Sequence, residues 1–399
     1  MQISICLIPL DQIALEELIK KIIMISKNKK IPVFDFKIQE KEKEFINDCL
    51  EKSFIGQGSY VKDFEEKFSK FVDCEYGITT TSGTTALHLA CETLGIKTGD
   101  QVLVSSSTNM ACAFAVDYCG GIPIPIDIEK ETWQMDVNKI EEKINKKTKA
   151  IMVVHLFGHP VDMDPVLKIS KKYNLKIIED CAEAHGVEYK GKKVGSIGDI
   201  GAFSFFANKT ITCGEGGMLV TNSKELAERA KSLKNLSYGK INKFMHEDIG
   251  FNYRLPNISA ALGLGQFLNI EKIFSEKKRI YNRYKNNLEK VKGVKIPLIR
   301  EWVTKYIMWV FNIYLDSNFP VSRDELVNKL QEKKIETRNA FVPINRQKIL
   351  LKKYDLFKEE DCPNANYIMD NGFYLPSGNT ISNDDIDFVC EQIINISKK

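Results

Sequence analysis

The sequence predicts an α/β protein built around a mainly parallel sheet that helices cover on both faces. Helix-like and strand-like patterns alternate from about residue 60 to residue 220, as repeated βαβ units require. Lys149–His155 is an apolar run bounded by charges, and Leu175–Asp180 is a second apolar run, as expected of strands buried in a parallel sheet. The chain has 399 residues, 43% of them hydrophobic, so it can bury a sizeable core without disulfide or metal cross-links.

The elements of this first part follow one another closely. Apolar residues from Val61 to Phe71 recur at helical spacing. In chain order we then expect a helix over Thr84–Leu94, a strand over Gln101–Val104, a helix over Met110–Tyr118, an extended segment over Ile122–Ile126, and the two apolar strands with a helix over Asp164–Tyr173 between them. Pro123 and Pro125 cannot donate to a ladder, so their segment is predicted to be an edge strand or no strand at all.

After Gly217 the pattern changes to a second, smaller part. Asn257–Leu288 is long and helical, and it precedes a strand over Met308–Leu315, a helix over Arg323–Lys333 and a C-terminal helix from Asn383. We therefore predict a large α/β domain over residues 31–270 and a small α+β domain over residues 271–399. The two need not be contiguous, because the first residues of the chain can pack with the second part.

Residues 1–30 are predicted to be an N-terminal extension. Apolar residues from Ile13 to Ile23 lie near helical spacing before the basic linker Lys27–Lys30, which indicates an amphipathic helix that packs on the body or on a partner chain. A helix on a membrane surface is the alternative. Asp11, Glu16 and other charges leave no window of about twenty uncharged apolar residues, so no transmembrane helix is expected. The segment also has no basic start followed by a clean apolar stretch and a small-residue cleavage site, so no secretory signal is expected.

Charge and cysteine content argue against several classes of protein. The net charge of +4, from 57 basic and 53 acidic residues in mixed order, is too small and dispersed for a dedicated binder of nucleic acid or acidic membranes. The ten cysteines form no CxxC pair and do not show the repeated cysteine and histidine spacing of a zinc site. We expect reduced, mostly buried thiols in a cytoplasmic protein, and no metal site.

Two groups of residues are placed to hold an anion and to supply carboxylates. Ser82–Thr85 leads into a predicted helix, where a glycine turn, hydroxyl groups and free amides could hold a phosphate, although the pattern is also a common helix cap. Asp180 ends an apolar strand, and Glu183 and His185 follow closely. Carboxylates at the carboxyl end of a parallel strand lie where α/β sheets bind ligands. A helix cap is the structural alternative for Asp180.

Lys209 follows an apolar strand and precedes the glycine-rich turn Gly214–Gly217. Partial burial there would make it a usable amine nucleophile, whereas a lysine reaching out to water is the structural alternative. A phosphate cradle, a strand-end carboxylate and a strand-end lysine together match the needs of pyridoxal 5'-phosphate. This cofactor requires an anchor for its phosphate, an amine for its aldehyde and an anion beside its pyridinium nitrogen.

At this point the chain from about residue 31 to residue 396 resembles the DegT/StrS-type sugar aminotransferases, which have the type I, aspartate-aminotransferase-like fold. The matching blocks are Gly56–Gly58, Phe64–Phe68, Ser82–Thr84, Gly158–Asp164, Glu179–Gly186, Ser204–Gly217, Gly250–Arg254, Ile335–Arg338 and Leu375–Gly378. The resemblance implies a homodimer whose active sites are shared between subunits.

The resemblance also implies catalytic roles by position. Lys209 would form the internal aldimine and move a proton between carbon atoms, Asp180 would pair with the pyridine nitrogen, and His185 would lie close to the cofactor. Pyridoxamine phosphate would carry the amino group between the two halves of the reaction.

Cofactor binding is implied for a further set of positions. Gly83, Thr84 and Ser204 would hold the phosphate, and Glu183 would lie near the ring hydroxyl. Asn252 would reach the phosphate of the neighbouring subunit.

Two positions depart from the family pattern. Asn109 lies where many relatives have an aromatic residue that stacks on the cofactor ring, so Met110 is a candidate to cover the ring instead. Asn345 lies where relatives often have a histidine that contacts substrate.

Four residues are candidates to contact the substrate. Arg254 and Arg338 could grip a diphosphate, because a planar guanidinium binds two oxygens at once, while structural ion pairs are the alternative for both. His159 and Phe341 complete the set.

The predicted function is transfer of an amino group from glutamate to C4 of a nucleotide-linked 4-keto-6-deoxy sugar for polysaccharide biosynthesis. Residues 208–217 with Glu183 are most similar to family members that use GDP-4-keto-6-deoxymannose, and UDP- or dTDP-linked keto sugars are the alternatives. Relatives that dehydrate a sugar at C3 replace the lysine by histidine, so Lys209 argues against that reaction. A pyridoxal-phosphate-binding sensor without turnover is the non-enzymatic alternative.

Overall fold

The computed structural model describes residues 30–246 and 248–398. The amphipathic helix predicted within residues 1–30 lies outside the described residues. Within them, no helix is long and apolar enough to cross a membrane.

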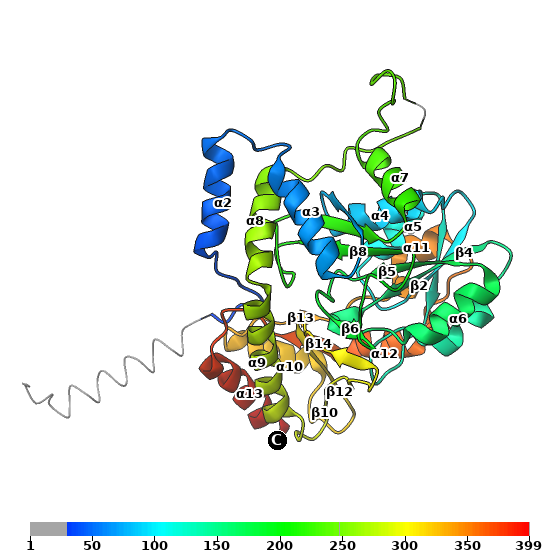
Figure 1. The fold of residues 1–399 in the computed structure, drawn as a ribbon. Helices are drawn as coiled ribbons and strands as arrows, with labels where there is room; N and C mark the ends of the chain where they lie inside the picture. Colours follow the sequence, from blue (N-terminus) through cyan, green and yellow to red (C-terminus); the bar gives the residue numbers. More distant parts are fainter. Residues whose placement is uncertain (1–29, 247, 399) are drawn as a thin grey trace, which may run out of the picture.

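A seven-stranded sheet forms the centre of the larger part of the chain (Figure 1). In spatial order its strands are β1 (Tyr76–Thr80), β9 (Gly217–Thr221), β8 (Ile200–Ser204), β5 (Lys176–Asp180), β4 (Thr148–Val154), β2 (Gln101–Ser105) and β3 (Ile122–Ile126). All neighbours from β8 to β3 pair in parallel, and β9 alone is antiparallel to both of its neighbours. The predicted α/β class with a mostly parallel sheet is therefore confirmed.

Strand β3 lies at one edge of this sheet, as its two prolines predict. Pro123 and Pro125 pair with Val102 and Val104 of β2 in a parallel register. An edge strand needs hydrogen bonds on one side only, so residues without an amide hydrogen are tolerated there.

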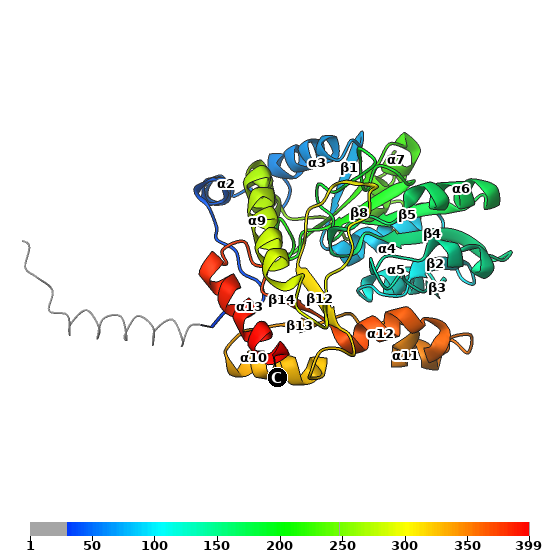
Figure 2. The same ribbon diagram turned by 90° about the horizontal axis from the view of Figure 1, so that it is seen from below.

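Helices cover both faces of the sheet (Figure 2). They are α3 (Ser59–Phe71), α4 (Gly83–Thr93), α5 (Ala111–Tyr118), α6 (Met163–Tyr173) and α7 (Lys224–Lys234). α4 and α5 lie on one side of the strands and α6 on the other, as right-handed crossovers in opposite directions along the sheet require. The predicted bounds of α4, α5 and α6 differ from these by a single residue at one or both ends, and the apolar stripe of α3 buries Phe64 and Phe68 completely.

The long helical stretch is two helices, α8 (Asn257–Leu268) and α9 (Ile270–Leu288). Asn269 separates them because its backbone leaves the helical conformation, and its side-chain amide donates to the Gly265 carbonyl at 3.3 Å. α2 (Glu40–Glu51) packs beside α8 (Figure 1).

The smaller part contains a four-stranded antiparallel sheet with its own hydrophobic core. Its strands are β10 (Val294–Lys295), β12 (Phe311–Leu315), β14 (Gly372–Leu375) and β13 (Arg338–Asn339) in spatial order. Helices α10 (Arg323–Glu332), α11 (Lys348–Lys353), α12 (Pro363–Asn371) and α13 (Asn383–Ser397) accompany it. Ile31 belongs to this second core and bridges to Ile335, so the first described residues pack on the smaller part. The domain boundaries at residues 30 and 270 stay predictions.

Short elements complete the chain. A three-stranded sheet has the order β11 (Val303–Lys305), β6 (Glu188–Tyr189) and β7 (Lys192–Lys193). Single 3-10 turns are η1 (Val137–Lys139), η2 (Glu141–Lys143), η3 (Leu156–Gly158), η4 (Ile344–Arg346) and η5 (Glu359–Asp361).

Candidate active site

A cavity of about 410 Å³ lies at the carboxyl ends of β1, β4, β5 and β8, where α/β sheets bind ligands. One wall comes from the large sheet and its loops and includes Gly83, Thr84, Asp180, Glu183, Ser204 and Lys209. The other wall comes from the smaller part and includes Trp309, Phe341 and Tyr374. Six of the positions predicted for cofactor binding therefore meet in one cavity.

The amino end of α4 forms an anion cradle in this cavity. Ser82 caps the helix, since its hydroxyl accepts from the Thr85 amide at 3.1 Å while the Thr85 hydroxyl accepts from the Ser82 amide at 2.9 Å. The amides of Gly83 and Thr84 come before the Thr85 amide that Ser82 caps, so they are available to bind an anion. A Cβ atom on Gly83 would lie 2.6 Å from Cβ of Ser204, so only glycine lets the Ser204 hydroxyl approach these amides.

Lys209 is held in the cavity by an acid and an aromatic ring. Its Nζ donates to Oε1 of Glu183 at 3.2 Å and lies 3.9 Å from the ring centroid of Trp309. The other oxygen of Glu183 accepts from the Phe157 amide at 3.0 Å. Burial raises the pKa of Glu183, and the Lys209 charge opposes that shift. The arrangement presents a primary amine inside a largely dry site.

Asp180 is the last residue of β5, and hydrogen bonds fix the orientation of both of its carboxylate oxygens. Oδ1 accepts from the Ala182 amide at 2.9 Å, and Oδ2 accepts from the Cys112 thiol at 2.9 Å. Burial raises the pKa of Cys112, so its thiol stays protonated and donates. A carboxylate fixed in this way can pair with a protonated ring nitrogen.

Three aromatic residues line the wall of the cavity that the smaller part contributes. Trp309, Phe341 and Tyr374 come from the smaller part, and Phe157 stacks on the first two with interplanar angles of 12° and 8°. Phe341 was predicted as a substrate contact, whereas Trp309 and Tyr374 were missed. Their place depends on how the smaller part packs against the sheet, which no short sequence pattern shows.

Asn109 and Asn345 are occupied by local contacts. Oδ1 of Asn109 accepts from the Ala111 amide at 3.0 Å just before α5, and the residue also lines the cavity. Met110 is not among the lining residues. Asn345 is fully buried, where its amide donates to the Glu359 carbonyl at 2.6 Å.

His185 lies outside the cavity lining. Its ring is fully buried within 6.2 Å of the rings of Phe68, Phe203 and Phe205. Burial lowers its pKa to about 3, so the ring is neutral. The turn after Asp180 directs this side chain toward α3, and its proposed closeness to the cofactor stays a prediction.

The remaining substrate candidates also lie outside the lining. His159 is buried with Nδ1 donating to the Pro160 carbonyl at 2.8 Å and Nε2 accepting from the Arg300 amide at 3.2 Å. Arg254 donates to Oδ1 of Asn235 at 2.8 Å. Arg338 is exposed on β13. Their roles toward a substrate stay predictions.

Asn252 has an exposed side chain and is not among the residues that line this chain's cavity. Its backbone bridges to Asn235 at the end of α7. An exposed position outside the chain's own cavity is compatible with the predicted reach to a neighbouring subunit.

The cavity residues fit pyridoxal 5'-phosphate. Gly83, Thr84 and Ser204 provide an anion cradle, Asp180 provides a fixed anion, and Lys209 provides an amine in the same cavity. The fold and this site together define a pyridoxal-phosphate-dependent enzyme of the type I class.

Comparisons with known proteins agree. Residues 36–394 match the DegT/DnrJ/EryC1/StrS aminotransferase family. A GDP-perosamine synthase of Escherichia coli O157:H7 is 42% identical over 92% of this chain and 98% of its own length. A dTDP-3-amino-3,6-dideoxy-alpha-D-galactopyranose transaminase of Aneurinibacillus thermoaerophilus is 34% identical over 90% of this chain and 96% of its own length. The crystal structure of DesV from S. venezuelae superposes with a TM-score of 0.87 at 28% identity, over 93% of this chain and 100% of that one.

The chain belongs to the DegT/DnrJ/EryC1/StrS aminotransferase family. It is a pyridoxal-phosphate-dependent sugar aminotransferase, which confirms the predicted enzyme class and cofactor. When bound, the cofactor supplies the aldehyde that takes up the amino group and the ring that stabilises negative charge on carbon.

Proposed function

We propose that this enzyme transfers the amino group of glutamate to C4 of GDP-4-keto-6-deoxymannose and so forms GDP-perosamine. The observation that carries the proposal is the 42% identity to a GDP-perosamine synthase over nearly the full length of both chains. The cavity supports it, because the amine, the carboxylate and the anion cradle that an aminotransferase needs are all present.

Each of the main cavity residues would have its own role in the reaction. Lys209 would carry a proton between carbon atoms, and Glu183, 3.2 Å from its Nζ, would stabilise the charged form of the amine. Asp180 would hold a proton on the ring nitrogen. The buried wall formed by Trp309 and Tyr374 would exclude water from the reacting atoms.

The nucleotide would lie outside the cavity proper. Arg338 is exposed on β13, close in sequence to Phe341 of the cavity wall, and is available to a diphosphate. Arg254, half-buried beside Asn235, is the second candidate. We also propose a homodimer with shared sites, which works in the cytoplasm.

A dTDP- or UDP-linked keto sugar is the competing substrate. A relative at 34% identity is named for a dTDP-linked amino sugar. The donor and the position of amination are also part of the proposal, since both depend on the substrate that the site orients.

The test offers GDP-, UDP- and dTDP-linked 4-keto-6-deoxy sugars, each with glutamate, and compares kcat/KM. We expect the GDP sugar to lead and the product to carry nitrogen at C4, as determined by NMR. The Lys209→Ala variant is the blank. A preference of about tenfold for another nucleotide, or about 1.4 kcal/mol, would overturn the GDP assignment and leave the aminotransferase assignment intact. Aspartate or glutamine in place of glutamate tests the donor in the same assay.

A further inference from the structure

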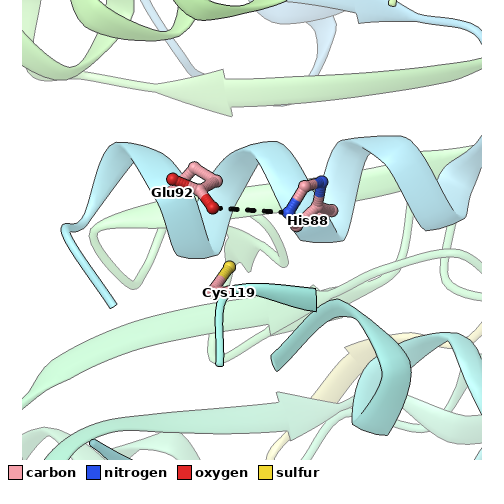
Figure 3. Close-up of side chains that lie close together, drawn as sticks. All are labelled: His88, Glu92 and Cys119. Atoms are coloured by element: carbon pink, nitrogen blue, oxygen red, sulfur yellow. Dashed lines mark ion pairs between the residues drawn. The ribbon is translucent and has the colours of Figure 1, made fainter. Parts of the chain in front are cut away.

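A cluster of three metal-ligating side chains lies outside the active-site cavity (Figure 3). His88 and Glu92 are one turn apart on α4, and Cys119 directly follows α5. A ring nitrogen of His88, a carboxylate oxygen of Glu92 and Sγ of Cys119 all lie within 4.8 Å of one another. His88 and Glu92 project from α4 toward Cys119, which lies on the turn after α5 (Figure 3).

His88 supplies a nitrogen without a hydrogen-bond partner. The residue is 5% exposed, and its Nε2 has no hydrogen-bond partner in the described chain. The nearest oxygen of Glu92 is 3.5 Å away, which is too long for a good hydrogen bond. A tetrahedral metal with bonds of about 2.0–2.1 Å places two ligand atoms roughly 3.4 Å apart. The histidine–glutamate spacing therefore suits a shared metal better than a direct contact.

The second ring nitrogen of His88, Nδ1, is held in place by neighbouring residues. Nδ1 of His88 lies 2.9 Å from the hydroxyl of Tyr253, and the rings of Phe251 and Tyr118 pack around the imidazole at 4.9 and 5.6 Å. Metal-bound histidines characteristically engage their second nitrogen in this way, since the contact fixes the tautomer and the ring orientation.

A second cluster contains the same three residue types and allows their hydrogen bonds to be compared. His155, Glu179 and Cys181 also lie within 4.8 Å of one another. Glu179, however, accepts from His155 and from the amides of Gly195, Ile197 and Gly198, and Nδ1 of His155 accepts from the Val161 amide. Hydrogen bonds therefore satisfy His155 and Glu179, whereas Nε2 of His88 has only the 3.5 Å contact with Glu92.

We propose that His88, Glu92 and Cys119 bind one divalent transition-metal ion, with Zn²⁺ the best match. Imidazole, carboxylate and thiolate are all zinc ligands, and three protein ligands leave a fourth position for water. Cys119 now donates to the Ala115 carbonyl at 3.3 Å, and on metal binding the thiol would give up this hydrogen bond and lose its proton. Half-exposed Glu92 gives the ion a route from solvent.

The place of the site suggests what the ion does. α4 begins at the anion cradle, His88 lies at its middle, and Glu92 lies near its opposite end. A metal there would join α4 to the end of α5, and through Tyr253 to the segment that carries Asn252. It would stabilise the helix that presents the phosphate amides without touching the reacting atoms.

The experiment uses the full-length holoenzyme under reducing conditions. The protein is loaded with Co²⁺, freed of unbound metal, and examined by elemental mass spectrometry and absorption spectroscopy. We expect about one Co²⁺ per chain, a thiolate-to-cobalt charge-transfer band, and displacement by Zn²⁺. Zn²⁺ should also raise the melting temperature of the wild type. Absence of stoichiometric metal from the wild type overturns the proposal.

Matched variants locate the ion. Cys119→Ser should abolish the charge-transfer band, and Glu92→Gln should weaken binding at least tenfold. Tyr253→Phe, which removes only the partner of Nδ1, should weaken it by about 10- to 100-fold. Cys390→Ser, in the second core, is the control and should bind as the wild type does. Unchanged binding by the Glu92→Gln variant overturns the proposal even if the cysteine variant fails to fold, because Glu92 is half-exposed and its replacement tolerable.

Discussion

The thiol of Cys112 donates a hydrogen bond of 2.9 Å to Oδ2 of Asp180, while the Ala182 amide donates to Oδ1 at the same distance. Cys112 lies in α5 and is fully buried. This hydrogen bond joins α5 to the carboxyl end of β5, a strand that α5 does not directly precede or follow in the chain. A buried cysteine thereby sets the plane of the carboxylate that is proposed to meet the ring nitrogen.

Replacement of this thiol should lower turnover. Cys112→Ala removes one hydrogen bond to a charged group, worth about 1.5 kcal/mol, so we expect kcat to fall roughly tenfold. Cys112→Ser keeps a donor and should retain most of the activity. The measurement is kcat with cofactor occupancy determined separately. Equal loss in both variants would show that packing, and not the donor, matters at this position.

Removal of the carboxylate charge should have a larger effect. Asp180→Asn keeps the shape but not the anion beside the ring nitrogen, and we expect turnover to fall at least ~10²-fold, the scale of one preorganised electrostatic contact. Asp164→Asn, on the exposed start of α6, is the matched control. Wild-type turnover in Asp180→Asn would reduce Asp180 to a structural cap.

Lys209 should be the residue that takes the cofactor covalently. Borohydride reduction of the holoenzyme followed by peptide mapping should find the cofactor on Lys209, and Lys209→Ala should lose both the label and turnover. Lys277 is an informative internal control, because it is also a buried amine but lies outside the cavity. Label on Lys277, or turnover by Lys209→Ala at the wild-type rate, would contradict the assignment.

The fold itself was largely predictable from the sequence. Apolar runs such as 149–155 have the length of a buried strand, and the prolines at 123 and 125 mark an edge, because both signals are local. The break at Asn269 was not predicted, since the apolar pattern continues through it.

The candidate site was predictable only where its residues are local. Gly83, Asp180 and Lys209 lie at strand ends and helix starts, whose meeting point the topology fixes. Trp309 and Tyr374 reach the cavity through the packing of the smaller part, which leaves no short-range pattern. Cys112 was interpreted as a buried thiol because its partner is distant in sequence.

Lys277 should make stability depend on pH. Its Nζ is fully buried and donates to the carbonyls of Trp309 and Ser377, both at 2.8 Å, and burial lowers its pKa to about 7. The unfolded chain, with a lysine pKa of about 10.4, binds the extra proton between these two values. The free energy of unfolding should therefore rise with pH in that window, by up to about 1.4 kcal/mol per pH unit from this group.

Urea unfolding at several pH values above 7 measures this slope. Lys277→Met should lose it, and Lys278→Met, the exposed neighbour on the same helix, should keep it. Parallel pH curves for the wild type and Lys277→Met would show that the buried amine does not titrate in this window.

The last prediction concerns assembly, and it follows from the exposed position of Asn252. If Asn252 completes the phosphate site of a neighbouring subunit, Lys209→Ala and Asn252→Ala each inactivate a homodimer for a different reason. A hybrid of the two keeps one intact site, because the wild-type Lys209 of one subunit meets the wild-type Asn252 of the other. Random exchange of equal amounts should restore about a quarter of wild-type activity. Mixing Lys209→Ala with a double variant that carries both changes is the control and should restore none. Verified hybrids without activity would place Asn252 in its own subunit's site or in no site, and the shared-site proposal would fail.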